Sequence, residues 1–523
     1  MTNKEYIIIA SPPTPNGNLH LGHMSGPYLS ADILTRFLRL RNNSVYFASN
    51  IDSYQSYLVT KAEEKSQTVE VLHDEYRSKI KSSISDYSIN ADSMDAPSSK
   101  KNAFVRNIFQ KLFKSNILIE KETMEPFCED KKRFLYDAYI SGNCLNCYSP
   151  TKGNICEKCG HPNEPHKLLN KKVTNFQDNK ISYKPVTRLY FPLERYREQL
   201  KKYYFYESKC NLRPNLVNFL REILENELDD FPVTQPGEWG NKLQIEGYKN
   251  HILNPWAEII FTFIYDINLN CGEDYMKKSN NEIIQFYGFD NSFFFAILHV
   301  ALLMALGSEI QLPKTQINNE FLLLNYQKFS SSKNHAIWAD EAADNYNTDF
   351  LRLYLSYINP EYHQSNFVES EFLNLIENKF VMPLVSIINV HNNLIYDNNI
   401  LHLNPAKDEF VRIIDFYKRR INSYLYPENF SIREATNNLF KMINEINIYI
   451  SNQKSLSNTW FFLSSLTKLI YPIMPNFALE LSRHLFKESK ITAELDKNYF
   501  NAKLVIIPHD SILEVMSVKQ KIA

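Results

Sequence analysis

Residues 6–49, YIIIASPPTPNGNLHLGHMSGPYLSADILTRFLRLRNNSVYFAS, hold the pattern that decides the fold. The opening run Tyr6–Ala10 is apolar without interruption, which is typical of a buried parallel strand. After a loop, residues 22–41 place apolar side chains at helical spacing, and Val45–Ser49 is a second short strand. Strand, loop, helix and strand in this order form a βαβ unit, so we expect an α/β fold with a parallel sheet.

The length and composition indicate a globular protein of several domains. The chain has 523 residues, of which 44% are hydrophobic and 22% charged, and a typical domain of roughly 100 to 200 residues implies about three or four domains. The net charge of -1 excludes a strongly basic protein as a whole. An RNA partner would therefore have to meet a local basic surface.

The sequence argues against secretion and against membrane insertion. The apolar run Ile7–Ala10 is too short for the core of a signal peptide. The longest apolar stretch, Phe293–Leu306, carries His299 and falls short of the roughly 18 residues that a membrane span needs, so it is expected to be a buried helix. Seven cysteines, four of them clustered, fit a reducing compartment with a metal site, and we expect the cytoplasm.

The loop that opens the first helix contains the most specific local pattern. It reads Pro-Asn-Gly-Asn-Leu-His-Leu-Gly-His over residues 15–23. Two imidazoles beside a glycine at a helix N-terminus suit a polyanion, because free backbone N–H groups and the helix dipole already favour phosphate there. Gly22 would let a nucleotide base approach closely. The alternative is that His20 and His23 are incidental loop residues or metal ligands.

A cysteine cluster predicts a zinc site. The pairs Cys144-x2-Cys147 and Cys156-x2-Cys159, separated by a turn-rich octet, have the spacing of a tetrahedral thiolate site for Zn²⁺. Four thiolates leave no open coordination position, so the ion would be structural. The other cysteines lack such spacing and are expected to be ordinary thiols: Cys128, Cys210 and Cys271.

The sequence His20-Leu21-Gly22-His23 resembles the HIGH signature of class I aminoacyl-tRNA synthetases, and the family's Pro-Asn-Gly precedes it. Further segments are similar to the methionyl branch, which also carries a zinc knuckle in its connective insertion: residues 31–47, 234–240, 246–248 and 287–290. The likeness covers essentially the whole chain. It implies a Rossmann-type catalytic domain that uses ATP and Mg²⁺, with His20 and His23 as catalytic groups. The residues implied in ATP binding are Pro15, Asn16, Gly17, Gly22, Gly288 and Asp290.

A second family signature, the mobile KMSKS loop, resembles residues 328–333, which read KFSSSK. The resemblance implies that Lys328 is catalytic and that Ser330 and Ser332 contact ATP. Ser331 stands where the family has a second lysine, and Lys333 is the candidate that substitutes for it. Loss of one well-placed donor to the transition state costs on the order of 10² to 10³ in rate. The alternative is a solvated serine-rich loop without a role.

The resemblance also implies an amino-acid pocket. Asp52 occupies the position of the aspartate that takes the amino group, which is the expected chemistry for a carboxylate. Its surroundings depart from the methionyl pattern at several positions: Pro12, Thr14, Ile51, residues 254–258, Phe295 and His299. Core packing would also explain Phe295. A thioether needs an apolar, polarisable pocket, so the identity of the amino acid stays open. The residues expected to bind the amino acid are Pro12, Thr14, Asp52, Trp256, Phe295 and His299.

The C-terminal part is helical in period after Phe367 and resembles an anticodon-binding bundle. Met382 and Ser386 replace an Asn and an Arg of the family, and Leu456 replaces a Trp that would stack on a base. Trp460, one helical turn on, is a candidate to restore that stacking. Recognition of the methionine anticodon is therefore in question, whereas general RNA binding is not excluded.

Five segments are predicted along the chain. They are residues 1–115 and 236–312 (the two halves of the catalytic domain), 116–235 (the connective insertion with the zinc knuckle), 313–370 (the KMSKS-like loop and linker) and 371–523 (the anticodon-binding-like bundle).

The expected function is ATP-dependent activation of an amino acid to its adenylate and transfer to tRNA. The expected partners are an amino acid and a tRNA but no membrane, and the protein is expected to be a monomer or homodimer. One alternative keeps adenylation but passes a different amino acid to a non-tRNA acceptor, or serves a biosynthetic pathway. Another is a catalytically inactive paralogue that binds nucleotide or tRNA, an idea that Ser331 supports and the retained His20, His23, Asp52 and Lys328 oppose.

Overall fold

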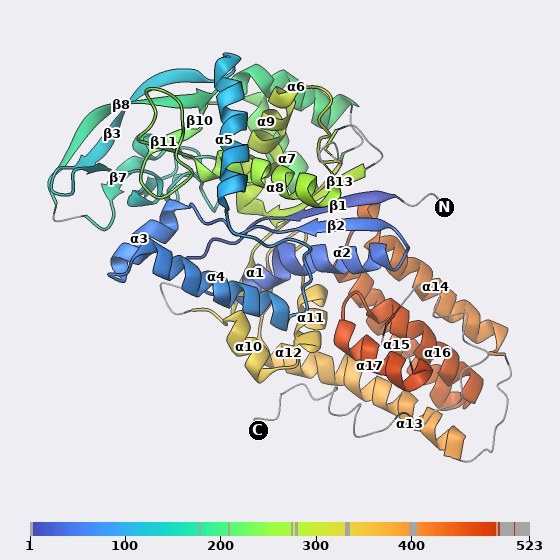
Figure 1. Cartoon of the computed structure of the whole chain (residues 1–523). Helices are drawn as coiled ribbons and strands as arrows, with labels where there is room; N and C mark the ends of the chain where they lie inside the picture. Colours follow the sequence, from blue (N-terminus) through green and yellow to red (C-terminus); the bar gives the residue numbers. More distant parts are fainter. Residues whose placement is uncertain are drawn as a thin grey trace.

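The computed structural model describes residues 4–176, 179–207, 210–272, 276–277, 281–329, 335–396, 405–487, 490–491 and 507 (Figure 1). At its centre is a parallel sheet of five strands in the order β2-β1-β13-β14-β9. These strands are β1 (Glu5–Ala10), β2 (Ser44–Ala48), β9 (Asn211–Leu212), β13 (Asn281–Gly288) and β14 (Thr315–Asn319). The expected α/β fold with a parallel sheet is confirmed.

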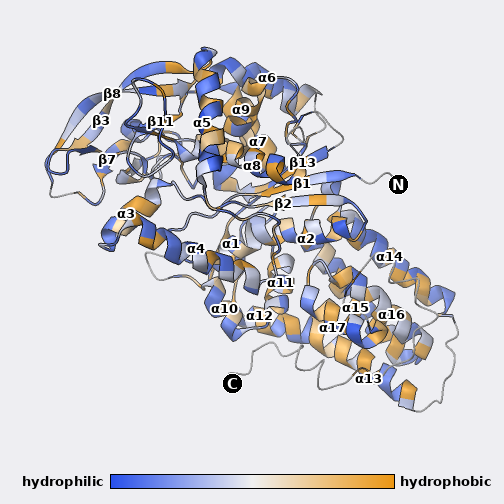
Figure 2. Ribbon diagram, viewed as in Figure 1, coloured by the Kyte–Doolittle hydropathy of each residue, from blue (hydrophilic) through white to orange (hydrophobic). Residues whose placement is uncertain are grey.

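Both faces of the sheet are covered, which explains the unbroken apolar run in β1. Ile8 belongs to the core shared with α2 (Leu29–Arg39) and the C-terminal helices. Ile7 and Ile9 point to the other core, which includes α8 (Pro255–Cys271) and α9 (His299–Leu306). Figure 2 shows hydrophobic residues along α8 and α9, on the side of the sheet away from α2.

The helix expected over residues 22–41 is not continuous. It consists of α1 (Leu21–His23), a π-helical turn (Met24–Tyr28) and α2. Pro27 lies inside the π-helical turn, where it has no N–H to donate to the preceding turn. The wide turn therefore accommodates a proline that a regular helix would not.

An insertion follows the first strands and carries three small antiparallel sheets (Figure 1). Their strands are β3 (Ile119–Cys128), β4 (Arg133–Phe134), β8 (Ile181–Phe191) and β10 (Phe231–Pro232); β5 (Ile140–Asn143), β6 (Pro150–Lys152) and β7 (Leu169–Val173); and β11 (Thr234–Pro236) with β12 (His251–Leu253). A further small sheet contains β15 (Leu322–Leu324), β16 (Gln327–Lys328) and β17 (Ser365–Phe367). β9 lies within the range 116–235 but joins the central sheet, so the segment boundaries stay predictions.

Helices flank the sheet and form the C-terminal bundle at the lower right of Figure 1. Those of the first part are α3 (Ser56–Glu64), α4 (Val69–Asp86), α5 (Ser99–Lys114), α6 (Arg197–Lys201) and α7 (Pro214–Glu225). The later ones are α10 (Ala339–Asn345), α11 (Thr348–Tyr357), α12 (Glu369–Ile376), α13 (Met382–Tyr396), α14 (Asp408–Leu425), α15 (Ile432–Asn452), α16 (Leu456–Ile470) and α17 (Pro475–Phe486).

A buried arginine joins the bundle to the sheet domain. Arg352 of α11 is completely enclosed and donates to Oδ2 of Asp32 on α2 at 2.8 Å. Its other N–H groups donate to the carbonyl oxygens of Tyr87, Pro472 and Ile473. A buried guanidinium is tolerated when it is paired and its donors are used, so this contact holds the two parts in one arrangement.

The positions compared with an anticodon-reading surface differ in exposure. Met382 is 57% exposed and Ser386 is partly exposed, whereas Leu456 is buried. Trp460 is fully enclosed and its ring lies 6.0 Å from that of His391. The expectation that Trp460 restores stacking on a base is wrong, because the ring is packed in the core of the bundle.

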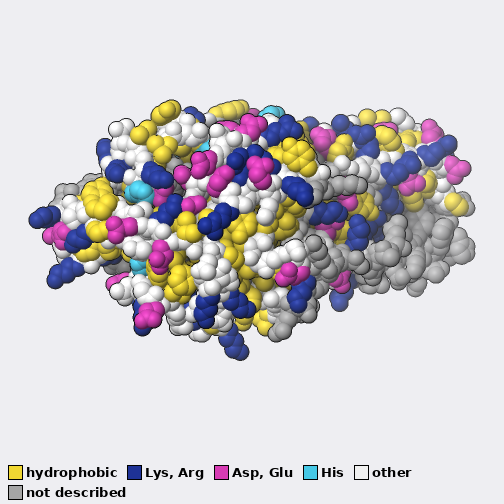
Figure 3. All heavy atoms as spheres, turned by 90° about the horizontal axis from the view of Figure 1, so that it is seen from above, with side chains coloured by type: hydrophobic (Ala, Val, Ile, Leu, Met, Phe, Trp, Pro, Cys, Tyr) yellow, Lys and Arg dark blue, Asp and Glu magenta, His cyan; other side chains and the backbone are white. Residues whose placement is uncertain are grey.

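Two helical stretches are long and apolar enough to cross a membrane by length and composition alone, residues 289–306 and 369–396. Most of the first is buried inside the protein, as expected for the helix around Phe293–Leu306. Figure 3 shows one face of the molecule, on which basic and acidic side chains are interspersed. That distribution agrees with the near-zero net charge of the sequence.

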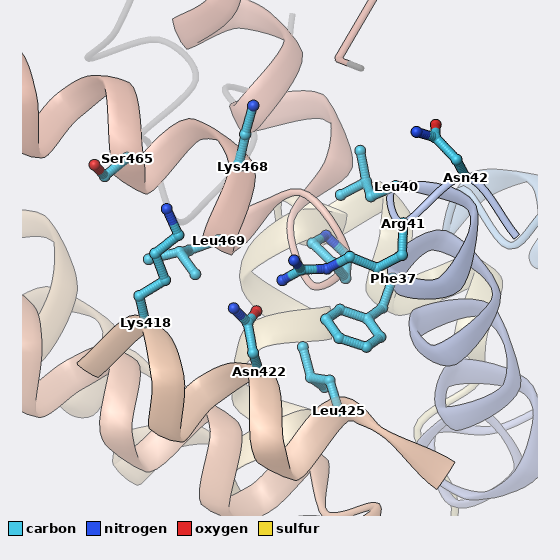
Figure 4. A pocket seen from close by; sticks show the side chains of 11 residues that line it. Phe37, Leu40, Arg41, Asn42, Lys418, Asn422, Leu425, Ser465, Lys468 and Leu469 are labelled. Atoms are coloured by element: carbon cyan, nitrogen blue, oxygen red, sulfur yellow. The ribbon is translucent and has the colours of Figure 1, made fainter. Parts of the chain in front are cut away.

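A cavity of about 280 Å³ lies where the C-terminal end of α2 meets α14 and α16 (Figure 4). Arg41, Lys418 and Lys468 line it, and no carboxylate is among its lining residues in the described part of the chain. The Arg41 guanidinium lies over the ring of Phe37, 5.1 Å from its centroid. None of the predicted site residues lines this cavity, so it is separate from the site described next.

Candidate active site

His20 and His23 lie in the turn between β1 and α2, at the carboxyl edge of the sheet. Their rings stack with centroids 3.7 Å apart, and the backbone N–H of His20 donates to Nδ1 of His23 at 3.1 Å. Nδ1 of His20 is buried and has no hydrogen-bond partner among the described residues. Since a buried polar atom without a partner is costly, this nitrogen indicates a place for a ligand.

The pKa of each imidazole lies below its ordinary value, although His20 is only half-buried and His23 is exposed to solvent. Desolvation, followed by the neighbouring His23, lowers the pKa of His20 to about 2, and desolvation lowers the pKa of His23 to about 4. Because His23 accepts a hydrogen bond at Nδ1, its proton sits on Nε2, which stays a donor. The pair therefore offers neutral hydrogen-bonding groups and not cations.

The KMSKS-like segment is anchored against His20 on both sides of residues 330–334. Before them, the ring of Phe329 stacks on His20 with centroids 4.6 Å apart. After them, Trp338 forms an isolated antiparallel bridge with His20. Four residues of this segment lie outside the described part of the chain: Ser330, Ser331, Ser332 and Lys333.

The loop before the histidines, Pro15-Asn16-Gly17, has free space beside it, since no atom lies within 4 Å of a Cβ built on Gly17. Gly22 is different. A Cβ built there would lie 2.9 Å from the ring of His20. The missing side chain at Gly22 therefore makes room for the imidazole of His20.

Gly288, Asp290 and Lys328 converge on the same side of the site. Gly288 ends β13, and a Cβ built there would lie 2.5 Å from Oδ1 of Asp290. Burial, followed by Glu157, raises the pKa of Asp290 to about 7, whereas Lys328 lowers it. Lys328 is exposed, with Nζ 4.1 Å from the centroid of the Phe321 ring. This side thus combines an accessible cation with a half-buried carboxyl group.

Asp52 follows β2 and is buried beneath the loop that follows β1. Its backbone N–H donates to the carbonyl oxygen of Pro13 at 2.9 Å, next to the half-buried Pro12. Gln55 donates to Oδ2 of Asp52 at 2.7 Å, and Thr14 also hydrogen-bonds the carboxyl group. Burial raises the pKa of Asp52 to about 7, although both hydrogen bonds lower it. No cation contacts this carboxyl group among the residues that the structure describes, and a substrate ammonium would supply one.

The other residues expected to bind the amino acid lie in an aromatic cluster. Trp256 stacks on Phe294 with centroids 3.8 Å apart, and its carbonyl oxygen is hydrogen-bonded to Nε2 of His299 at 2.8 Å. Phe295 stacks on Tyr287 at 4.9 Å. Phe295 and His299 are completely buried, whereas Trp256 is partly exposed. Phe295 thus packs in the core that includes α8, and Trp256 is the accessible member of the cluster.

The four predicted zinc ligands form one cluster. Sγ of Cys144 lies 3.7 Å from Sγ of Cys159, and Sγ of Cys147 lies 3.5 Å from Sγ of Cys156. All four sulfurs lie within 4.8 Å of one another. Tetrahedral bonds of about 2.3 Å to zinc place sulfurs about 3.8 Å apart, so the cluster fits the ion.

The cysteine cluster packs against the segment that carries Asp290. Gly160, directly after Cys159, has a φ of +73°, a conformation that favours glycine. A Cβ there would lie 3.3 Å from Phe219 and 3.4 Å from Phe289. The knuckle therefore supports one side of the candidate site from behind.

Sequence reasoning missed three contacts of the site. Gln55, Phe329 and Trp338 were not singled out, although Gln55 binds Asp52 and the two aromatic residues flank His20. The position of Gln55 three residues after Asp52 was its only signal. Phe329 lies within the KMSKS-like text, and we find no sequence signal for Trp338.

Two methionine–tRNA ligases are similar in sequence to this chain. A methionine–tRNA ligase from Pyrococcus furiosus is 30% identical over 413 residues, which cover 75% of this chain and 56% of that enzyme. One from Flavobacterium johnsoniae is 29% identical over 469 residues, covering 86% of this chain and 65% of the relative. The chain thus spans between 56% and 65% of the length of these two relatives.

A solved structure has a similar fold, and a sequence model of a protein family matches the chain. A Mycobacterium tuberculosis methionyl-tRNA synthetase in complex with methionyl-adenylate aligns with a TM-score of 0.76 at 15% identity, covering 97% of this chain and 98% of that chain. This similarity shows a shared fold. The sequence model of tRNA synthetases class I (M) matches residues 6–391. Because that match covers well over half of the 523 residues, the chain belongs to the class I tRNA synthetases (M).

Proposed function

We propose that the protein activates an amino acid with ATP and passes the aminoacyl group to tRNA, in the manner of a methionyl-type class I enzyme. Family membership supports this proposal. The single observation that carries it is the arrangement of the buried Asp52 and the His20-His23 pair at the same carboxyl edge of a parallel sheet. Nucleotides and their co-substrates bind at such edges in open α/β folds.

In this proposal ATP lies along the loop that precedes α1. Its phosphates accept hydrogen bonds from His20 and His23, and the exposed Lys328 neutralises charge on them. Mg²⁺ would accompany the phosphates. The segment that contains Gly288 and Asp290 lies where the nucleoside would bind. The remaining ATP contacts are assigned to Pro15, Asn16, Gly17, Gly22, Ser330, Ser332 and Lys333.

The amino acid is proposed to bind with its ammonium on Asp52 and its side chain toward Trp256. Pro12 and Thr14 form the loop above it, with His299 and Phe295 behind. Its carboxylate attacks the α-phosphate in line, a P–O bond forms, and the bond to the departing pyrophosphate breaks. The protein positions the groups and stabilises charge.

Amino-acid binding is expected to weaken as the pH falls through neutrality. Asp52 must be ionised to hold an ammonium, and burial raises its pKa to about 7. Its ionised fraction in the free protein changes about tenfold between about pH 6 and about pH 8, so KM for the amino acid should be about tenfold lower at the higher pH. ATP–pyrophosphate exchange measured across this range checks the prediction. Asp52→Asn, which cannot titrate, should show a flat profile; a flat wild-type profile would contradict the assignment.

We assign Zn²⁺ to the four-cysteine cluster as a structural ion. Cys156→Ser should remove the metal and lower the free energy of unfolding by more than about 4 kcal/mol, because the small sheet of β5, β6 and β7 has little core of its own. Metal analysis with thermal unfolding measures both effects. Cys128→Ser is the matched control, since Cys128 is equally buried but outside the cluster. Equal metal content in the two variants would refute the zinc site.

A tRNA charging assay tests the second half of the proposed function. The protein, ATP, labelled amino acids and bulk tRNA should yield labelled tRNA, and RNase treatment should release the label. The alternative, an adenylate-forming paralogue with another acceptor, is favoured by the changed positions Met382, Ser386 and Leu456 and by the buried Trp460. Adenylate formation without labelled tRNA would replace the first proposal by that alternative.

A further inference from the structure

Glu258 is a buried carboxylic acid that the proposed function does not use. It lies in the first turn of α8 and is 4% exposed. Its Oε2 has no hydrogen-bond partner among the described residues. Burial raises the pKa of Glu258 well above its ordinary value, although a hydrogen bond from Asn241 lowers it. Since an unpartnered buried carboxyl oxygen is costly, it indicates an atom kept for a ligand.

The direction in which Glu258 faces follows from the path of α8. This helix runs back along β2 and the loop after it. Near its C-terminal end, the hydroxyl of Tyr46 donates to the carbonyl oxygen of Asp266 at 3.3 Å. One turn earlier in the helix, Asn50 donates to Oγ1 of Thr262 at 3.0 Å. Each successive turn toward the N-terminus of α8 therefore contacts a residue that lies further along the segment formed by β2 and the loop after it.

One more turn leads from Thr262 to Glu258, on the same face of α8. The part of the loop after β2 that lies beyond Asn50 contains Asp52 and Tyr54. Glu258 is close enough to both residues for their charges to interact. The charge of Glu258 raises the pKa of Tyr54, and the charge of Asp52 raises the pKa of Glu258. The structure thus brings a second carboxyl group to the side of the proposed ammonium site.

Among the described residues, the other neighbours of Glu258 do not place a basic side chain in contact with its carboxyl group. Asn241 lies behind it, accepting from Arg106 at 3.0 Å and donating to the carbonyl oxygen of Asn102 at 3.2 Å. On the side of Asp52 the contacts come from Thr14 and Gln55, which are uncharged. No ion pair involving Glu258 occurs in the described parts of the chain. Among the residues that the structure describes, therefore, neither Asp52 nor Glu258 forms an ion pair with a basic side chain.

We propose that Glu258 recognises the side chain of the substrate, and that the activated amino acid carries a cationic donor there, an amine or a guanidinium. This inference rests on the proposed function and narrows its substrate class. Asp52 would hold the α-ammonium, and Oε2 of Glu258 would accept from the second cation. Each contact restores an ionised carboxylate in a desolvated site. A thioether has no donor and would leave Glu258 unpartnered.

Two measurements on the full-length protein test this proposal. The first is ATP–pyrophosphate exchange with lysine, ornithine, 2,4-diaminobutyrate, arginine and methionine. The second is the shift in Tm that each amino acid causes without ATP. We expect one cationic amino acid to exceed methionine about 100-fold in kcat/KM, since a site built for a donor rejects analogues that lack it. Glu258→Gln, which keeps the shape, should reduce this preference about 100-fold. Glu225→Gln, an exposed acid on α7, is the matched control.

The outcomes separate this inference from the proposed function. Exchange that prefers methionine, with a preference unchanged in Glu258→Gln, would overturn the role of Glu258 and leave activation standing. If exchange is absent but a cationic amino acid raises the Tm of the wild type and not of Glu258→Gln, activation fails and the role of Glu258 holds. The absence of both exchange and a Tm shift would overturn both.

Discussion

Replacing His20 by alanine is expected to slow amino-acid activation by about 10²- to 10³-fold while leaving the protein folded. The His20 ring is held between His23 and Phe329, and its buried Nδ1 has no partner among the described residues. In the proposed reaction it contacts the phosphates as charge develops. Its removal should therefore act mainly on kcat, because the interaction strengthens in the transition state.

A matched variant separates the loss of hydrogen bonding from the loss of packing. His20→Phe keeps an aromatic ring against Phe329 but cannot hydrogen-bond, so it should be as slow as His20→Ala. ATP–pyrophosphate exchange gives kcat and KM, and circular dichroism checks the fold. Near wild-type kcat in His20→Phe would show that the ring only packs, and the catalytic assignment would fail.

Replacing Ser331 by lysine is expected to raise the rate of activation, by up to about 10²-fold. The family signature has a lysine at this position, and the wild-type chain keeps Lys328 but has Ser331 instead of the second lysine. A second cation next to the phosphates would stabilise charge that develops as pyrophosphate leaves. Single-turnover formation of the adenylate measures the effect without interference from product release.

The control is Ser331→Gln, which adds length without charge and should not accelerate the reaction. Lys333→Ala tests the other possibility, that Lys333 already supplies the second cation. If Lys333→Ala slows wild-type activation by 10-fold or more and Ser331→Lys brings no gain, the substitute role belongs to Lys333. The prediction for Ser331→Lys would then be wrong.

Much of the fold followed from local sequence pattern. The run Tyr6–Ala10 became β1, with both faces buried as its unbroken apolarity predicted. The spacing of the four cysteines predicted their cluster, because a metal site of this type depends on short loops. Both features depend on residues close in sequence, which a single chain reveals directly.

Features that depend on contacts between residues far apart in the sequence could not be predicted from the sequence. Trp460 looked like a candidate platform for a base, yet packing against His391 and the rest of the bundle encloses it. The position of Glu258 beside Asp52 depends on how α8 lies along β2, and that register joins residues about two hundred positions apart. The π-helical turn at Pro27 likewise reflects accommodation of a proline within a helix that the apolar period alone suggested was regular.

Amino-acid activation at this site is tested by ATP–pyrophosphate exchange with each of the twenty standard amino acids, comparing the wild type with His20→Ala. We predict exchange that depends on an amino acid and that falls about 10²- to 10³-fold in the variant. If the wild-type protein is folded, contains zinc and still exchanges with none of the twenty, the assignment of Asp52 and His20 to activation of a standard amino acid is contradicted. The protein would then have to be a binding paralogue or use a nonstandard substrate.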